Sequence, residues 1–84
     1  MRFSVFWEES AEEALANLFL DSSDRYEIRV ASDRIDELLK TQADRIGSEV
    51  HEGLRSLKAT PLKVLFSVST DDCRVEVLAV ARVE

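Results

Sequence analysis

Residues 62–82 read LKVLFSVSTDDCRVEVLAVAR and carry the strongest structural signal in this 84-residue chain. Apolar residues occupy every second position on both sides of a polar segment, residues 69–72. This period of two is typical of β-strands that bury one face, and a short polar loop between two such runs predicts a β-hairpin. The predicted buried face consists of Leu62, Val64, Phe66, Val68, Val75, Val77, Ala79 and Ala81.

The opposite face of this hairpin mixes cationic and apolar side chains. It is predicted to carry Lys63, Leu65, Arg74, Leu78, Val80 and Arg82. A sheet surface with leucine and valine between cations is a candidate contact surface for a protein partner. We expect an acidic amphipathic segment to cover it, with a homodimer as the alternative.

Two amphipathic helices are predicted in the first half of the chain. Ser10 and Glu13 have the spacing of a capping box, and the apolar stripe that follows predicts a helix over residues 11–20. Residues 21–23 are expected to end this helix and to provide the N-cap of a second one, which runs to about Thr41.

The remaining segments complete the expected fold. Residues 2–7 alternate and predict a first strand, and residues 42–50 a connector. Within residues 51–59, the run from Leu54 to Lys58 predicts a short strand before the hairpin. Because each helix has one apolar stripe, both helices should pack on one face of the sheet. The prediction is an α+β fold of order β-α-α-β-β-β with a mainly antiparallel sheet, in a single domain over residues 1–84.

The formal net charge of −6 is concentrated in one half of the chain. Residues 1–50 hold 6 basic and 12 acidic residues, a difference of −6, whereas residues 51–84 hold 5 of each. An acidic protein repels nucleic acid overall. The single cysteine, Cys73, excludes an internal disulfide, and we expect neither a metal site nor a cofactor. Without a recognisable signal peptide or a membrane-spanning run, a cytoplasmic protein is expected.

This order of elements resembles the RelE/ParE toxin superfamily of bacterial toxin–antitoxin systems. The segments that carry the resemblance are the strand ending in Trp7, the acidic helix after it, residues 31–39, Gly53-Leu54-Arg55, residues 61–68 and residues 74–80. The resemblance implies a toxin of the plasmid-stabilisation type. It also implies a cognate antitoxin as the partner, bound on the sheet face.

The resemblance further implies two kinds of target. RelE-type members are ribosome-dependent mRNA endonucleases, and ParE-type members act on DNA gyrase. The catalytic candidates by resemblance are His51, Arg55, Lys58 and Arg82. RelE-type members usually carry a tyrosine or histidine near the C-terminus, but this chain ends in Ala81-Arg82-Val83-Glu84. We therefore expect a ParE-like or catalytically degenerate toxin. The alternatives are a RelE-type endonuclease and a non-toxic binding module that keeps the fold.

Overall fold

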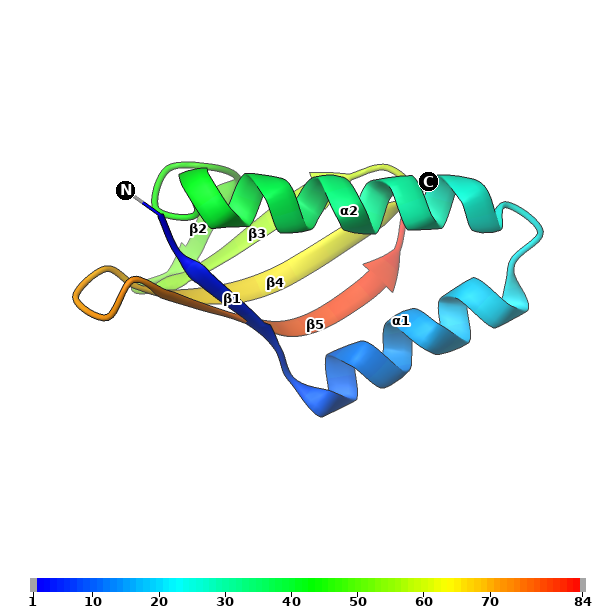
Figure 1. Ribbon diagram of the computed structural model, residues 1–84, viewed down its shortest axis with the longest axis horizontal. Helices are drawn as coiled ribbons and strands as arrows, with labels where there is room; N and C mark the ends of the chain where they lie inside the picture. The colour runs from blue at the N-terminus through cyan, green and yellow to red at the C-terminus, as the bar shows by residue number, and fades with distance from the viewer. Residues whose placement is uncertain (1, 84) are drawn as a thin grey trace.

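The computed structural model describes residues 2–83 and has two layers, a pair of helices and a five-stranded sheet (Figure 1). The elements are β1 (Ser4–Trp7), α1 (Glu9–Asp21), α2 (Arg25–Gln42), β2 (Ser48–His51), β3 (Leu54–Ala59), β4 (Leu62–Ser69) and β5 (Arg74–Arg82). Helix α1 lies mainly against β5, whereas α2 contacts β1, β3 and β4. Neither helix in the described range is long and apolar enough to cross a membrane.

The strands are ordered β1-β5-β4-β3-β2 across the sheet. Strand β1 runs parallel to β5, and all other neighbours are antiparallel. The predicted α+β class, with the helical hairpin on one face of a mainly antiparallel sheet, is confirmed. The prediction of a connector over residues 42–50 is wrong for its last three residues, which belong to an additional edge strand, β2, paired with β3.

Gly47 allows the chain to enter β2 close to its neighbouring strand. Its φ of +74° lies in the left-handed region, where residues with a Cβ are disfavoured. A Cβ at this position would also collide with the backbone carbonyl of Ser56 on β3. Glycine is therefore required here both by the backbone conformation and by the close approach of β3.

Both helices begin one or more residues away from the predicted caps. Helix α1 begins at Glu9 with Glu8 as its N-cap, so Ser10 lies inside the helix and the predicted capping box is wrong. Helix α2 has Asp24 as its N-cap instead of a residue from 21–23. Neither N-cap side chain bonds to the helix backbone, and the Asp24 carboxylate instead binds an arginine of β5.

The core lies between α2 and the inner face of the central strands. The fully buried side chains include Ile28, Ile35, Leu39, Leu62, Val64, Phe66, Val75 and Val77. The strand residues among them alternate as the sequence predicts, and the helical residues form the predicted stripe of α2. Burying these large aliphatic and aromatic side chains supplies the main driving force for folding.

A β-bulge in β5 interrupts the predicted alternation. Phe66 pairs with Val77, but the preceding residue of β4, Leu65, pairs with Ala79, so that Leu78 is an extra residue in β5. One extra residue exchanges the two faces for the rest of the strand. Val80 is consequently buried, with only 9% of its surface exposed, whereas Ala79 and Ala81 are exposed. The predicted faces of these three residues are therefore wrong.

Candidate functional site

The sheet surface opposite the helices, which we call the outer face, is partly apolar. Its central rows follow from the strand pairing, which places Ser56, Leu65 and Ala79 side by side, and Lys58, Lys63 and Ala81 side by side. A shallow depression of about 320 Å³ lies over these rows and is also lined by Val50, which is 58% exposed. The outer face thus offers an open apolar strip flanked by lysines.

The two lysines of the outer face lie directly opposite each other. Lys58 of β3 pairs with Lys63 of β4, and both side chains are exposed. Like charges in directly opposed positions of an antiparallel pair are unfavourable. Within residues 2–83, no ion pair joins either lysine to a carboxylate. This part of the surface therefore carries an uncompensated positive charge.

The third cation of the outer face is already engaged. The Nε of Arg74 donates a hydrogen bond to Oε1 of Glu76 at 3.1 Å. The guanidinium also lies 4.1 Å from the centroid of the Phe6 ring on β1, at cation–π distance. Arg74 thereby covers part of an aromatic ring that remains 45% exposed.

Two of the four predicted catalytic residues face the helical side of the sheet. Arg55 pairs with the buried Phe66, and its Nε donates to the carbonyl oxygen of Ile46 at 3.0 Å. Arg82 pairs with the buried Leu62. Its guanidinium donates two hydrogen bonds to the Asp24 carboxylate at 2.8 and 2.7 Å. The hydrogen bond from Arg82 lowers the pKa of Asp24 below its usual value.

The other two predicted catalytic residues lie far apart. His51 pairs with Leu54 at one end of β3, and Lys58 lies near the other end. Leu54 and Lys58 are four residue steps apart along an extended strand, a distance of about 13 Å between their Cα atoms. Arg55 and Arg82 thus lie on the opposite face of the sheet from His51 and Lys58, so the strand pairing does not bring the four candidates to one face.

The predicted partner surface is only partly assembled. Lys63, Leu65 and Arg74 lie on the outer face, as the strand pairing requires. Val80 is buried in the core, although it lines part of the depression, and Arg82 binds the start of α2, so neither presents an exposed side chain on the outer face. Leu78 is the extra residue of the bulge and is half-buried. Ala79, Ala81 and Val50 join the surface instead.

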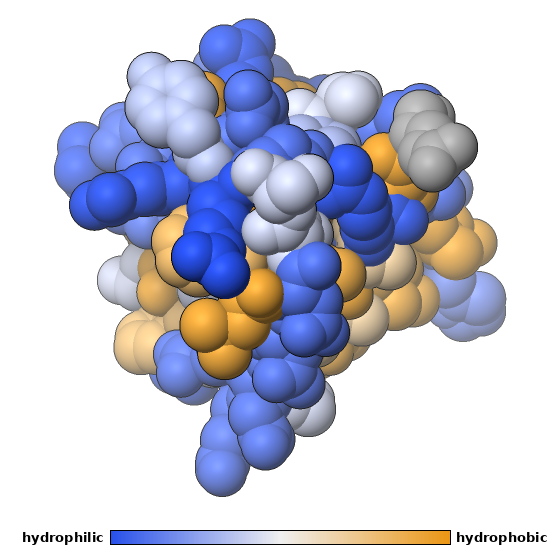
Figure 2. Space-filling model, turned by 90° about the vertical axis from the view of Figure 1, so that its right-hand side faces the viewer, coloured by the Kyte–Doolittle hydropathy of each residue, from blue (hydrophilic) through white to orange (hydrophobic). Residues whose placement is uncertain are grey.

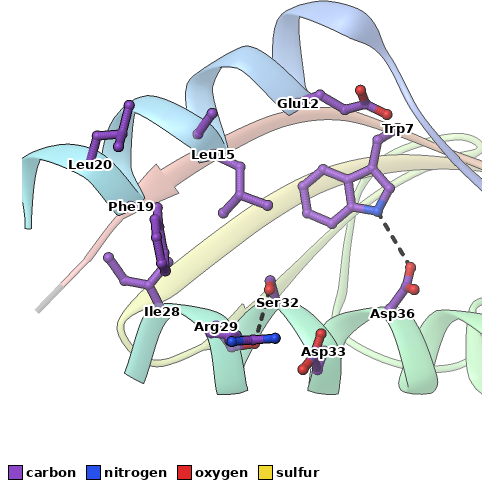
Figure 3. Close-up of a pocket in the computed structure, with 11 residues that line it drawn as sticks. Trp7, Glu12, Leu15, Phe19, Leu20, Ile28, Arg29, Ser32, Asp33 and Asp36 are labelled. Atoms are coloured by element: carbon purple, nitrogen blue, oxygen red, sulfur yellow. Dashed lines mark hydrogen bonds between the residues drawn. The ribbon is translucent and has the colours of Figure 1, made fainter. Parts of the chain in front are cut away.

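A second concave surface, which the sequence analysis missed, lies between the two helices. We call it the interhelical groove; its volume is about 610 Å³. Figure 3 shows Leu15 and Phe19 of α1 opposite Ile28 of α2, with the Trp7 ring at one end. The apolar stripe of α1 was predicted correctly, but apart from the buried Ala11 it is only half-buried, because α1 packs more extensively on β5 than on α2. In the sequence, only Leu20 pointed to this surface: it is a leucine outside the predicted apolar stripe of α1, and the structure leaves it exposed.

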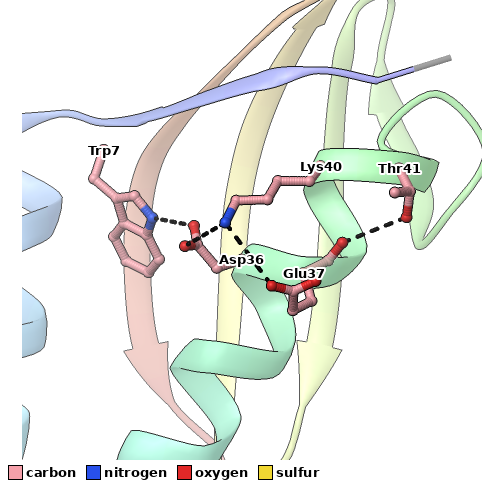
Figure 4. A network of polar contacts seen from close by, with 5 residues as sticks. All are labelled: Trp7, Asp36, Glu37, Lys40 and Thr41. Atoms are coloured by element: carbon pink, nitrogen blue, oxygen red, sulfur yellow. Dashed lines mark hydrogen bonds and ion pairs between the residues drawn. The ribbon is translucent and has the colours of Figure 1, made fainter.

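Polar contacts hold Trp7 at the end of the groove (Figure 4). The indole Nε1 donates to Oδ1 of Asp36 at 3.4 Å, a long hydrogen bond. Lys40 lies 3.8 Å from Asp36 and 3.8 Å from Glu37, so that one cation links two acids of α2. Among the described residues, no three histidine, cysteine, aspartate or glutamate side chains gather in a metal-binding arrangement.

Comparison with solved structures identifies the fold. The chain matches the toxin–antitoxin complex RelBE2 from Mycobacterium tuberculosis with a TM-score of 0.80 and 15% identity, over 98% of this chain and 92% of that chain. It matches the chromosomal ParDE system from P. aeruginosa with a TM-score of 0.66 and 20% identity, over 99% of this chain and 98% of that chain. For the isolated E. coli RelE toxin the TM-score is 0.65 with 16% identity, over 100% of this chain and 86% of that chain.

The protein therefore has the fold of RelE- and ParE-type toxins, which confirms the predicted resemblance at the level of the fold. No protein-family model matches the sequence, and no curated protein is significantly similar to it. Several of the matched structures are complexes of a toxin with its antitoxin. The fold is shared by RelE and ParE structures alike, so it does not distinguish between their targets.

Proposed function

We propose that this protein is the toxin-like component of a type II toxin–antitoxin pair and that a cognate antitoxin binds it on the outer face. The shared fold supports this proposal, because the structures that resemble this chain include such complexes from bacteria and from an archaeon. We further propose a ParE-like or catalytically degenerate protein that acts in the cytoplasm, in a role of the plasmid-stabilisation type.

The observation that carries the proposal is the Lys58–Lys63 pair beside an apolar strip. Two opposed lysines destabilise the isolated protein, and a carboxylate placed between them would relieve the repulsion. The neighbouring Leu65, Ala79 and Ala81 provide apolar area for affinity, and the lysines would set the register of the bound segment. An acidic amphipathic segment fits this combination better than a second copy of the chain, which would bring two more lysines.

Binding to the product of the adjacent reading frame tests this surface. The variant K58E/K63E keeps two like charges opposite each other, so its stability should be similar to that of the wild type. The charge of the surface, however, changes from positive to negative. We expect it to weaken binding by at least about tenfold, because an attraction becomes a repulsion at the interface. The control R34E/R45E makes the same change in net charge on exposed residues outside the outer face.

Unchanged binding by K58E/K63E would contradict the outer face as the contact surface. Equal weakening by both double variants would mean that only the net charge matters. Light scattering on the isolated chain provides a separate check. A stable dimer that dissociates in K58E/K63E would favour the alternative of self-association through this face.

We propose that the protein does not cleave mRNA on translating ribosomes. Cleavage of a phosphodiester by its own 2′-hydroxyl needs a general base and a nearby acid or cation. Arg55 donates a hydrogen bond to the Ile46 carbonyl and Arg82 to the Asp24 carboxylate, both from the helical face of the sheet. Along β3, about 13 Å separates the residue that pairs with His51 from Lys58. We expect no codon-specific cleavage when the protein is expressed. Cleavage that is lost in R55A would instead support a RelE-type endonuclease. The target, DNA gyrase or the ribosome, can be identified by capture with the wild-type protein.

A further inference from the structure

The interhelical groove exposes apolar surface that the protein itself does not cover. The corresponding stripe of α2 is fully buried at Ile28 and Ile35, whereas Leu15 and Phe19 of α1 are only half-buried. Leu20, at the end of the groove, is 63% exposed. Figure 2 views the end of the molecule where α1 is connected to α2 and shows apolar surface between hydrophilic side chains. A cavity of about 610 Å³ is of the size that accepts several large apolar side chains.

The rim of the groove is acidic. Glu12 projects from α1, and Asp33 and Asp36 from α2, while Arg29 is the single cation among the residues that line the groove (Figure 3). Asp36 is engaged by Trp7 and Lys40, but in the part of the chain from 2 to 83 no ion pair reaches Glu12 or Asp33. Helix α1 as a whole contains four acidic residues and no basic one.

We propose that the interhelical groove binds an amphipathic helical segment of a partner protein, with lysine or arginine on both sides of its apolar stripe. The apolar stripe would fill the space between Leu15, Phe19 and Ile28. The flanking cations would meet Glu12 on one wall and Asp33 on the other. This inference rests on the proposed function only in assuming a protein partner, and the groove is separate from the outer face.

The charge of the rim argues against two other occupants. A second copy of this chain would have to insert α1 or α2; α1 carries only acidic charges, and the apolar stripe of α2 is already buried in the core of its own chain. Nucleic acid would be repelled by the same carboxylates. A cationic helix is attracted by them, and it presents its apolar side chains at the spacing that a groove between two helices requires.

Trp7 provides the measurement, because it is the only tryptophan of the chain and lies at the end of the groove. The probe is a peptide of about 18 residues, about 27 Å long as a helix, with leucines at i, i+3, i+4 and i+7 and lysines on both flanks. The matched peptide has glutamates in place of the lysines. We expect the lysine peptide to shift the emission of Trp7 and to bind at least about tenfold more tightly than the glutamate peptide. Its affinity should fall as salt is added.

Charge variants of the rim distinguish specific binding of the peptide in the groove from non-specific binding to the protein surface. E12K/D33K replaces two exposed acids and should reduce binding of the lysine peptide by at least about tenfold. E13K/E52K makes the same change in net charge at exposed positions outside the groove, and should leave the affinity within about twofold. Equal affinity for both peptides, an unaffected E12K/D33K variant, or no response of Trp7 would each overturn the inference.

The two proposals fail in different experiments. If an antitoxin binds and K58E/K63E weakens it, while neither peptide binds, then the groove inference is wrong and the proposed function stands. If the lysine peptide binds through Glu12 and Asp33 but no partner depends on the outer face, the proposed function is wrong and the groove remains a binding site.

Discussion

Replacing Val80 by alanine should destabilise the protein, whereas replacing the adjacent Ala79 by valine should not. Val80 is buried opposite Val64, and Ala79 is exposed opposite Leu65. Val80→Ala removes the equivalent of two buried CH₂ groups, which are worth about 0.8 kcal/mol each. With the cavity that remains, the free energy of unfolding should fall by about 2 kcal/mol. Ala79→Val should change it by less than about 0.5 kcal/mol, because its side chain stays in solvent.

Urea unfolding measures both effects, with circular dichroism and the fluorescence of Trp7 as independent probes. For a chain of this size, a loss of about 2 kcal/mol should lower the midpoint of unfolding by about 1–2 M urea and the melting temperature by about 8–16 °C. The carboxylate pair Val80→Asp and Ala81→Asp amplifies the contrast. A charge at the buried position should prevent folding, whereas a charge at the exposed neighbour should be tolerated.

These variants test the β-bulge itself. Without the extra residue Leu78, strict alternation would bury Ala79 and Ala81 and expose Val80. Ala81→Asp would then unfold the protein and Val80→Ala would be neutral. That result would refute the register of β5 and, with it, the composition of the outer face.

Two further predictions concern the Asp24–Arg82 ion pair and the turn before β2. The hydrogen bond from Arg82 holds the pKa of Asp24 below its usual 3.8, so the pair stabilises the folded state above that pH and its contribution is lost as the pH falls through the lowered value. Asp24→Asn should therefore lower the urea midpoint at pH 7, and its difference from the wild type should shrink in acid; a difference that persists in acid would exclude the ion pair as its cause. Gly47→Ala should destabilise the protein more than Gly53→Ala, since both have φ near +75° but only Gly47 would collide with a neighbouring carbonyl. The cost of Gly53→Ala should be about 1 kcal/mol, and equal costs in urea unfolding would contradict the close approach of Ser56.

The sequence predicted the parts of the fold where apolar and polar residues alternate clearly. In β4, the polar residues Lys63 and Ser67 alternate with buried apolar residues and so mark the opposite face of the strand. The apolar stripe of α2 is equally distinct. In β5, residues 77–81 are all apolar. Such a run does not specify which face is buried, so the bulge at Leu78 could not be located by periodicity.

The missed edge strand and the misplaced arginine depend on contacts between distant segments. Strand β2 is short and exposed along its whole length, and only its pairing with β3 defines it. Arg82 bonds to Asp24, which lies 58 residues earlier in the chain. No local pattern encodes this contact. Which face of β5 Arg82 occupies is determined by the bulge, so its place among the catalytic candidates could not be judged from periodicity.

The distribution of charge between the two sides of the molecule constrains any partner that contacts both. The outer face carries Lys58 and Lys63, whereas the rim of the interhelical groove carries Glu12 and Asp33. A single segment of uniform charge cannot satisfy both surfaces. The shortest dimension of the molecule is 21 Å, which takes at least about seven extended residues to cross. A wrapping partner would therefore need an acidic segment for the sheet, a linker of at least that length and a basic helix for the groove. Joined in this way, each segment would raise the effective concentration of the other, so K58E/K63E and E12K/D33K should each weaken the whole complex.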